Sequence, residues 1–170
     1  MTDGPVETFV NETAGEGSGQ EEARATTRTP DLEVPFPACI LETPPDPCTV
    51  VILGASGDLT ARKIVPALHN LFQNGGLPEA FNVVGCARSP LDDDAFRGKM
   101  KQAVREAPLA DASGWETFAP HLLYRVVDYE DPESFVRLAG ELRALDEDRG
   151  TRGNRIFYLA IPPALYRGVA

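Results

Sequence analysis

The segment Gly54-Ala55-Ser56-Gly57 combines residue types that suit the binding of an anion. A glycine at the end of a strand permits a tight turn, and a second glycine three residues later lets a phosphate approach the backbone closely. If a helix follows, its unpaired N–H groups carry a partial positive charge that attracts the phosphate, and the hydroxyl of Ser56 adds a donor. The spacing is Gly-x-x-Gly, so the motif alone also fits a loop whose two glycines serve only the turn.

The flanking residues provide the strand and the helix that such a loop requires. Residues 48–53 form a short apolar and β-branched run, which is typical of a strand buried on both faces. After the loop, apolar residues recur with the spacing of one helical face: Ile64, Leu68, Leu71 and Phe72. Because proline is poorly tolerated inside a helix, we expect a short first turn and then a main helix with Pro66 in its opening turn. The loop therefore has the context of a dinucleotide-binding motif.

A second candidate contact follows the next predicted strand, 81–87. Folds that prefer NAD usually place an acidic residue at the end of this strand, where it binds the ribose 2′-hydroxyl. Here the strand ends in Arg88-Ser89, with no acid. The guanidinium of Arg88 can pair with a 2′-phosphate through charged and bidentate hydrogen bonds. The pattern favours NADP over NAD, with a solvated surface arginine as the alternative.

The rest of the chain continues to alternate strands with helices. The further predicted strands are 122–127 and 156–161, and the further predicted helices are 92–105 and 132–145, with a short helical segment around Trp115 and a helix that begins at Pro163. Strict alternation implies right-handed crossovers and a parallel sheet with helices on both faces. We expect an α/β fold over residues 48–170, an incomplete, doubly wound Rossmann-type sheet of about four strands.

Residues 1–47 differ from the rest of the chain in composition and charge. They contain ten acidic residues against two basic ones, within a chain whose net charge is −10. They show little apolar periodicity, so they cannot bury enough surface to offset the entropy of ordering them. We expect a disordered acidic tail. Neither this tail nor the rest of the chain offers the broad basic face that nucleic-acid binding requires.

The sequence also predicts where in the cell the protein is located. No apolar run is long enough to span a bilayer, and the start of the chain has the features of neither a secretory signal nor a mitochondrial presequence. We therefore expect a cytoplasmic location and no membrane partner.

Cys39, Cys48 and Cys86 form no Cys-x-x-Cys motif and no ligand cluster, so we expect reduced structural thiols and no metal site.

Three segments together resemble the glucose-6-phosphate dehydrogenase family. They occur in the family's order and spacing: Gly54 to Leu59 with Arg62-Lys63, Pro66 and Leu71-Phe72; Val84 to Ser89; and Asn154 to Pro163. The resemblance spans residues 48–170 and does not cover residues 1–47. It implies a coenzyme domain followed by a larger α+β domain. It also implies oxidation of glucose 6-phosphate to the 6-phosphogluconolactone with reduction of NADP, the first step of the pentose phosphate pathway.

The resemblance also assigns roles to individual residues. It implies that the loop wraps the pyrophosphate of the coenzyme, through Gly54, Ala55, Ser56, Gly57, Asp58 and Leu59. Arg88 would bind the 2′-phosphate. Asp128 and Tyr129 would lie beside the adenosine half, and Tyr166 would lie near the nicotinamide. Lys63 matches a lysine near the sugar phosphate, with a lysine exposed on a helix surface as the alternative.

The catalytic base of the family is absent from this sequence. Hydride transfer from C1 of the sugar needs a base to take the hydroxyl proton. The resemblance implies a histidine in an Arg-Ile-Asp-His-Tyr-Leu-Gly-Lys stretch, which does not occur here, and a Glu-Lys-Pro segment for the substrate phosphate, which is also missing. We expect His69 and His121 to be structural. The chain would then hold the coenzyme site and no catalytic residue, and association into a homo-oligomer would need the full-length enzyme.

Two other classes of protein make different demands on the sequence. A free-standing dinucleotide-binding or regulatory module without catalysis would need a stable fold, whereas a four-stranded sheet leaves an apolar edge exposed. A short-chain reductase or epimerase would need a third glycine further along the loop and a Tyr-x-x-x-Lys pair, and neither occurs. The binding module remains the alternative.

Overall fold

The computed structural model of this chain describes residues 45–108 and 111–169, so the tail predicted over residues 1–47 lies almost entirely outside the described residues. A single parallel sheet has the strand order β3-β2-β1-β4. Its strands are β1 (Cys48–Leu53), β2 (Phe81–Ala87), β3 (Leu122–Val126) and β4 (Arg155–Leu159). The predicted α/β fold with a Rossmann-type parallel sheet is confirmed.

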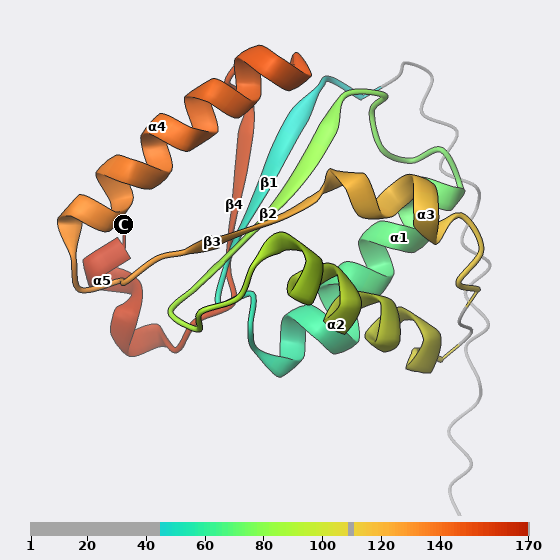
Figure 1. The fold of residues 1–170 in the computed structure, drawn as a ribbon, viewed down its shortest axis with the longest axis horizontal. Helices are drawn as coiled ribbons and strands as arrows, with labels where there is room; N and C mark the ends of the chain where they lie inside the picture. The colour runs from blue at the N-terminus through green and yellow to red at the C-terminus, as the bar shows by residue number, and fades with distance from the viewer. Residues whose placement is uncertain (1–44, 109–110, 170) are drawn as a thin grey trace, which may run out of the picture. The chain divides into compact units, whose positions relative to one another are not determined.

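Helices cover both faces of the sheet (Figure 1). One face carries α1 (Val65–Gln73), α2 (Asp93–Glu106) and α3 (Trp115–Phe118), and the other carries α4 (Pro132–Arg149) and α5 (Tyr166–Val169). Short helical turns complete the connections: η1 (Thr60–Ile64), η2 (Ala119–His121) and η3 (Pro163–Leu165). Each face has its own buried apolar cluster, as a doubly wound sheet requires. Within the described residues, no helix combines the length and apolarity that a bilayer crossing demands.

Local signals account for where the helices begin and end. Asp92 caps α2 by accepting the N–H of Ala95 at 2.7 Å, which fits the acidic run predicted for a helix amino terminus. Pro66 lies in the first turn of α1, and the π-type turn η1 precedes it, so the predicted division of this segment is confirmed. The prediction for α4 ended too early, because the helix continues to Arg149. The next residue, Gly150, has a φ of 74°, the left-handed conformation that commonly terminates helices.

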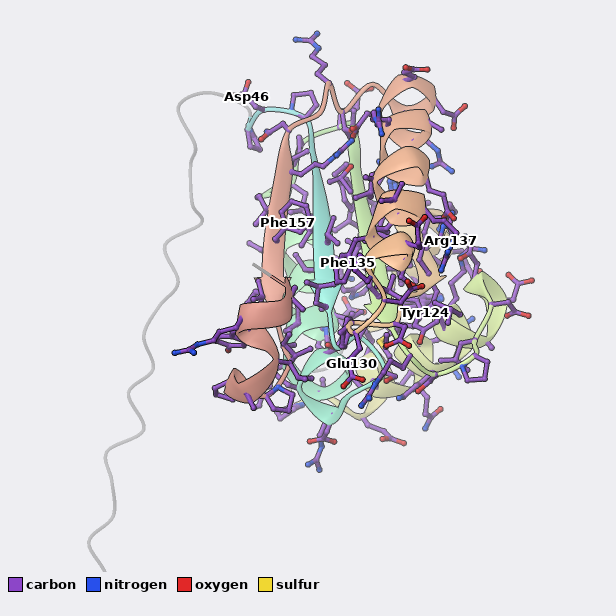
Figure 2. The ribbon with its side chains drawn as sticks, turned by 90° about the vertical axis from the view of Figure 1, so that its left-hand side faces the viewer. Asp46, Tyr124, Glu130, Phe135, Arg137 and Phe157 are labelled. Atoms are coloured by element: carbon purple, nitrogen blue, oxygen red, sulfur yellow. The ribbon has the colours of Figure 1, made fainter. Side chains whose placement is uncertain are left out.

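Burial differs sharply between the central strand β2 and the edge strand β4. Every residue of β2 is buried, as its apolar run predicts. In β4 the apolar residues Ile156, Phe157 and Tyr158 are 53%, 53% and 44% exposed, because only β1 pairs with this strand. In Figure 2, Phe157 lies at the open edge of the sheet, whereas Phe135 lies between α4 and the sheet. The exposed apolar edge expected from the sequence is therefore present.

A buried polar cluster holds β4 in place beside β1. The carboxylate of Asp146, on α4, accepts the hydroxyl of Thr151 at 2.5 Å and the Nε of Arg155 at 3.0 Å. The hydroxyl of Thr49, on β1, donates to that of Thr151 at 3.2 Å. Because these groups are hydrogen-bonded to one another, their burial leaves no unpaired charge. The cluster ties α4, β1 and β4 together at the amino ends of the strands and so sets where β4 begins.

Candidate coenzyme-binding site

The order in which the strands are added to the sheet reverses at β1, while all strands remain parallel. From β1 it proceeds to β2 and β3 on one side, and it then returns to place β4 on the other side. The connections leaving the carboxyl ends of β1 and β4 therefore diverge to opposite faces, and such a switch point is where open α/β sheets bind their ligands. The loop that begins at Gly54 follows β1 directly, so the structure places the predicted motif at this point.

Both glycines of the loop serve its geometry. Gly54 has a φ of +94°, and a Cβ atom built on it would lie 2.2 Å from the carbonyl oxygen of Ala160 at the end of β4. A side chain is therefore excluded by conformation and by space. The N–H of Gly57 donates to the carbonyl of Gly54 at 2.9 Å, which closes the turn. The loop thus runs directly against the end of the neighbouring strand.

Several N–H groups of the loop are available to an anion. Those of Ser56, Asp58 and Leu59 donate to no acceptor within the described part of the chain. The turn η1 follows at once, with its amino terminus at the loop. Unpaired N–H groups beside a helical amino terminus form a site for phosphate oxygens. The residues present therefore fit the pyrophosphate of a dinucleotide, although Asp58 is exposed and also pairs with Arg62 at 3.5 Å.

Tyr129 supports the loop through hydrogen bonds of its hydroxyl. It follows β3, is only 7% exposed, and its hydroxyl accepts the N–H of Gly54 at 2.7 Å and donates to the carbonyl of Cys86 at 2.9 Å. The same carbonyl accepts the N–H groups of Gly54 at 2.8 Å and Ala55 at 3.1 Å. Burial raises the pKa of Tyr129, so the hydroxyl stays protonated and can donate. The carboxyl ends of β1, β2 and β3 are joined at this point.

Arg88 leaves the end of β2 beside this cluster. It is exposed, and within the described residues it forms no ion pair. Its positive charge lowers the pKa of Tyr129, against the larger effect of burial. The carbonyl of the next residue, Ser89, accepts the hydroxyl of Tyr124 at 2.8 Å, which anchors this segment to β3. Arg88 is therefore free to bind an anion at the β2 side of the loop.

The remaining predicted residues lie around the same edge of the sheet. Asp128 is exposed and accepts the N–H of Glu130 at 3.1 Å in the turn before α4. Tyr166 is 41% exposed in α5, on the face covered by α4. Lys63 is exposed on η1. None of the described contacts joins Lys63 or Tyr166 to the loop, so their predicted roles remain predictions. A shallow groove beside α5 is lined by Tyr129, Glu130, Pro132, Phe135, Ala164, Leu165 and Gly168.

Two residues at the loop were not singled out from the sequence. The buried hydroxyl of Thr60 donates to the carbonyl of Gly54 at 3.4 Å, and its position three residues after the second glycine was a usable signal. The ammonium of Lys99, on α2, donates to the carbonyl of Ser56 at 2.6 Å. No local sequence pattern identifies Lys99, because it follows Ser56 by 43 residues and only the fold brings the two residues together.

Both histidines lie away from the carboxyl edge of the sheet. His69 is buried on α1 and packs against Trp115 and Phe118, with ring centroids 5.8 Å and 5.2 Å apart. The Nδ1 of His121 lies 2.8 Å from the carbonyl of Phe81, at the amino end of β2. Their surroundings are those of packed side chains. The thiol of Cys86 is also buried beneath the loop, and burial raises its pKa to about 12.

Comparisons with known proteins agree on one family. Residues 51–170 match the family model described as glucose-6-phosphate dehydrogenase, NAD binding domain. Glucose-6-phosphate 1-dehydrogenase of Chlamydia muridarum is 39% identical over 137 residues, which cover 79% of this chain and 26% of that protein. The enzyme of Aggregatibacter actinomycetemcomitans is 43% identical over 119 residues, which cover 70% of this chain and 24% of that protein. This chain thus spans about a quarter of the length of these relatives.

A solved structure shows the same fold. It is a glucose-6-phosphate dehydrogenase in complex with its substrate glucose 6-phosphate, with a TM-score of 0.66 and 30% sequence identity. The match covers 75% of this chain and 27% of that one. The region that matches the family model, residues 51–170, contains the glycine loop, Arg88 and all four strands except the first three residues of β1. Residues 51–170 match the NAD binding domain of these dehydrogenases, so this chain belongs to the glucose-6-phosphate dehydrogenase family of oxidoreductases.

Proposed function

We propose that this chain is the NADP-binding part of a glucose-6-phosphate 1-dehydrogenase. The observation that carries the proposal is the position of the glycine loop at the switch point of the sheet, where the N–H groups of Ser56, Asp58 and Leu59 have no acceptor among the described residues and could bind phosphate oxygens. Arg88, exposed at the end of β2, would bind the 2′-phosphate that distinguishes NADP from NAD. Residues 54–59 would then hold the pyrophosphate.

The complete enzyme would oxidise glucose 6-phosphate to the 6-phosphogluconolactone and reduce NADP. Hydride would pass from C1 of the sugar to the nicotinamide, and a base would take the proton of the C1 hydroxyl. The support for this reaction is the family, including a relative of known structure that binds glucose 6-phosphate as its substrate. Because the described histidines lie away from the loop, the base would come from a region that this chain does not contain.

Further assignments complete the proposal. Asp128 and Tyr129 would lie beside the adenosine half of NADP, Tyr166 would lie near the nicotinamide, and Lys63 would approach the sugar phosphate. The exposure of Asp128, Lys63 and Tyr166 supports these roles, since a contact residue must be accessible. The full-length protein would act in the cytoplasm as a homo-oligomer.

Equilibrium binding tests the coenzyme assignment directly. Titration of the purified chain with NADP and with NAD, followed by calorimetry, should give one site with a clear preference for NADP. The preference has a physical basis, because only NADP carries the 2′-phosphate that an unpaired arginine can bind. Failure to bind either coenzyme, or equal affinity for both, would contradict the proposed NADP site.

A turnover assay tests whether the chain acts alone. Absorbance at 340 nm with glucose 6-phosphate and NADP should show no reduction of the coenzyme by the purified 170-residue chain. A full-length relative assayed under the same conditions supplies the positive control. Clear turnover by the short chain would place the catalytic residues within it.

A free-standing binding module is the alternative function. The two buried apolar clusters support it, because they give each face of the sheet a core of its own. The exposed apolar residues of β4 weigh against it, since an open edge favours aggregation. Native-state amide exchange distinguishes the two: protection of the β4 amides in a monodisperse sample favours the module, whereas rapid exchange favours a part of a larger enzyme.

A further inference from the structure

The ammonium of Lys99 reaches the glycine loop from the helix that follows Arg88. Lys99 lies on α2, and its Nζ donates to the carbonyl of Ser56 at 2.6 Å. The side chain is exposed, so the ammonium occupies a solvent-facing position at the loop. A coenzyme phosphate bound by the loop would lie near the positive charge of this ammonium. Neither the glycine motif nor the family resemblance assigns a role to Lys99.

The other basic side chains in the middle of α2 are engaged by carboxylates. Arg97 pairs with Asp94 at 3.1 Å and with Asp93 at 3.8 Å. Lys101 pairs with Glu116 at 2.6 Å, on the side of α3. Lys99 takes part in no ion pair within the described residues. Its hydrogen-bond partner is a neutral carbonyl, so its charge remains uncompensated and available to an anion.

The position of α2 indicates which phosphate of the coenzyme the Lys99 ammonium would bind. The adenosine half of a dinucleotide lies on the β2 side of the switch point, where the strand that follows the first crossover ends. Arg88 leaves β2 on that side, and α2 is the next element of the chain. A phosphate monoester carries nearly two negative charges at neutral pH, so a single arginine leaves it incompletely neutralised. A second cation on the same side would complete the site.

We propose that Lys99 binds the 2′-phosphate of NADP together with Arg88, so that the preference for NADP depends on two cations from two elements. This inference rests on the proposed function, because it presupposes that NADP occupies the loop. On binding, the ammonium of Lys99 would keep its contact with Ser56 or exchange it for a phosphate oxygen. Either arrangement leaves the contact specific to the phosphorylated coenzyme.

Substitutions on α2 test the proposal with a matched control. Lys99→Met keeps the length of the side chain and removes its charge, Lys99→Arg keeps the charge, and Lys101→Met removes a charge that points away from the loop. Calorimetric titration of the full chain uses NADP, NAD and adenosine 2′,5′-bisphosphate. We expect Lys99→Met to raise the dissociation constants of NADP and the bisphosphate by about tenfold or more. The NAD constant should change less than about twofold, and Lys99→Arg should retain most of the affinity.

Two results from these variants would overturn the proposal. Equal weakening of NADP and NAD by Lys99→Met would show that Lys99 holds the loop or contacts the pyrophosphate. No change for either coenzyme would show that it is a surface lysine. The unsubstituted chain separates this inference from the proposed function: if that chain shows no preference for NADP, the NADP site itself is wrong. If it prefers NADP and Lys99→Met retains the full preference, only the role of Lys99 is wrong.

A measurement on the unsubstituted chain covers the case in which a variant does not fold. Acetylation of lysine amines, followed by peptide mass spectrometry, reports the accessibility of the Lys99 ammonium. At equal saturation, NADP should protect Lys99 several-fold more than NAD does, while Lys101 should be acetylated at the same rate with either coenzyme. Equal protection of Lys99 by NADP and NAD, or protection by neither, would contradict the proposal.

Discussion

The N–H of Gly54 donates to the hydroxyl of Tyr129 across 2.7 Å, although 75 residues separate the two in the sequence. The hydroxyl in turn donates to the carbonyl of Cys86, at the end of β2. A residue that follows β3 therefore supports the loop that follows β1. If the loop binds the coenzyme as proposed, its N–H groups must be held in place, so this support would bear on binding as well as on stability.

Tyr129→Phe should loosen the loop without emptying the core. The substitution removes one hydroxyl that makes two hydrogen bonds, while the N–H of Gly54 keeps the carbonyl of Cys86 as an acceptor. We expect the free energy of unfolding in urea to fall by about 0.5–1.5 kcal/mol. Affinity for NADP and NAD should weaken by a similar factor. Tyr158→Phe, on an exposed tyrosine of β4, is the control and should leave stability and binding unchanged.

Arg88→Ala should reduce the affinity for NADP and leave the affinity for NAD nearly intact. The loss of a charged hydrogen-bonded pair costs on the order of 1.5–3 kcal/mol, which calorimetric titration resolves easily. Arg105→Ala, on the last turn of α2, removes an exposed arginine for which the described residues show no ion pair, and it serves as a control for net charge. Equal losses for the two coenzymes would show that Arg88 does not contact the 2′-phosphate.

Gly54→Ala should disrupt the loop strongly. The new Cβ would lie 2.2 Å from the carbonyl oxygen of Ala160, at a φ of +94° that disfavours any side chain. Strain and steric overlap together should cost on the order of 3 kcal/mol or more of unfolding free energy. Gly98→Ala, on α2, meets no atom within 4 Å and should stabilise the chain by about 0.5–1 kcal/mol. Thermal unfolding of both variants measures the contrast.

Stability should fall as the pH drops below neutrality, with a contribution from His69. Burial lowers the pKa of this histidine below its ordinary value near 6.5, while Asp111 and the backbone of Ser113 oppose the effect. The unfolded chain therefore takes up the proton first as the pH falls through about 6.5, and the folded state loses stability until the pH reaches the lower, folded pKa. Each unit of difference between the two pKa values corresponds to about 1.4 kcal/mol.

His69→Phe tests this contribution. Phenylalanine keeps an aromatic ring among Trp115 and Phe118 but loses the interaction with the backbone of Ser113, so the test compares the change between two pH values within each chain. Urea unfolding at pH 7.5 and at pH 5 should show a smaller loss of stability on acidification for the variant than for the unsubstituted chain. The same loss in both would assign the pH dependence to other groups.

Much of the fold could be predicted from short stretches of sequence. The buried strands β1 and β2 have the predicted bounds, because a short apolar run between turn signals is a local pattern. The end of α4 was missed although Gly150 marks it, since the helical periodicity becomes weak before the cap. The predicted β4 began one residue late and ended two residues late, because the strand ends at Leu159 although the N–H of Ala160 still donates to the carbonyl of Leu53.

The sequence by itself determined the glycine loop, its flanking elements and the absence of an acid after β2, because each of these depends on neighbouring residues. Only the tertiary structure decided that Tyr129 supports the loop and that Lys99 reaches it. The physical reason is that parallel strands bring their carboxyl ends to one edge, so residues far apart in sequence meet there. Such contacts have no period or spacing that a local pattern could reveal, and the same edge is where a coenzyme would bind.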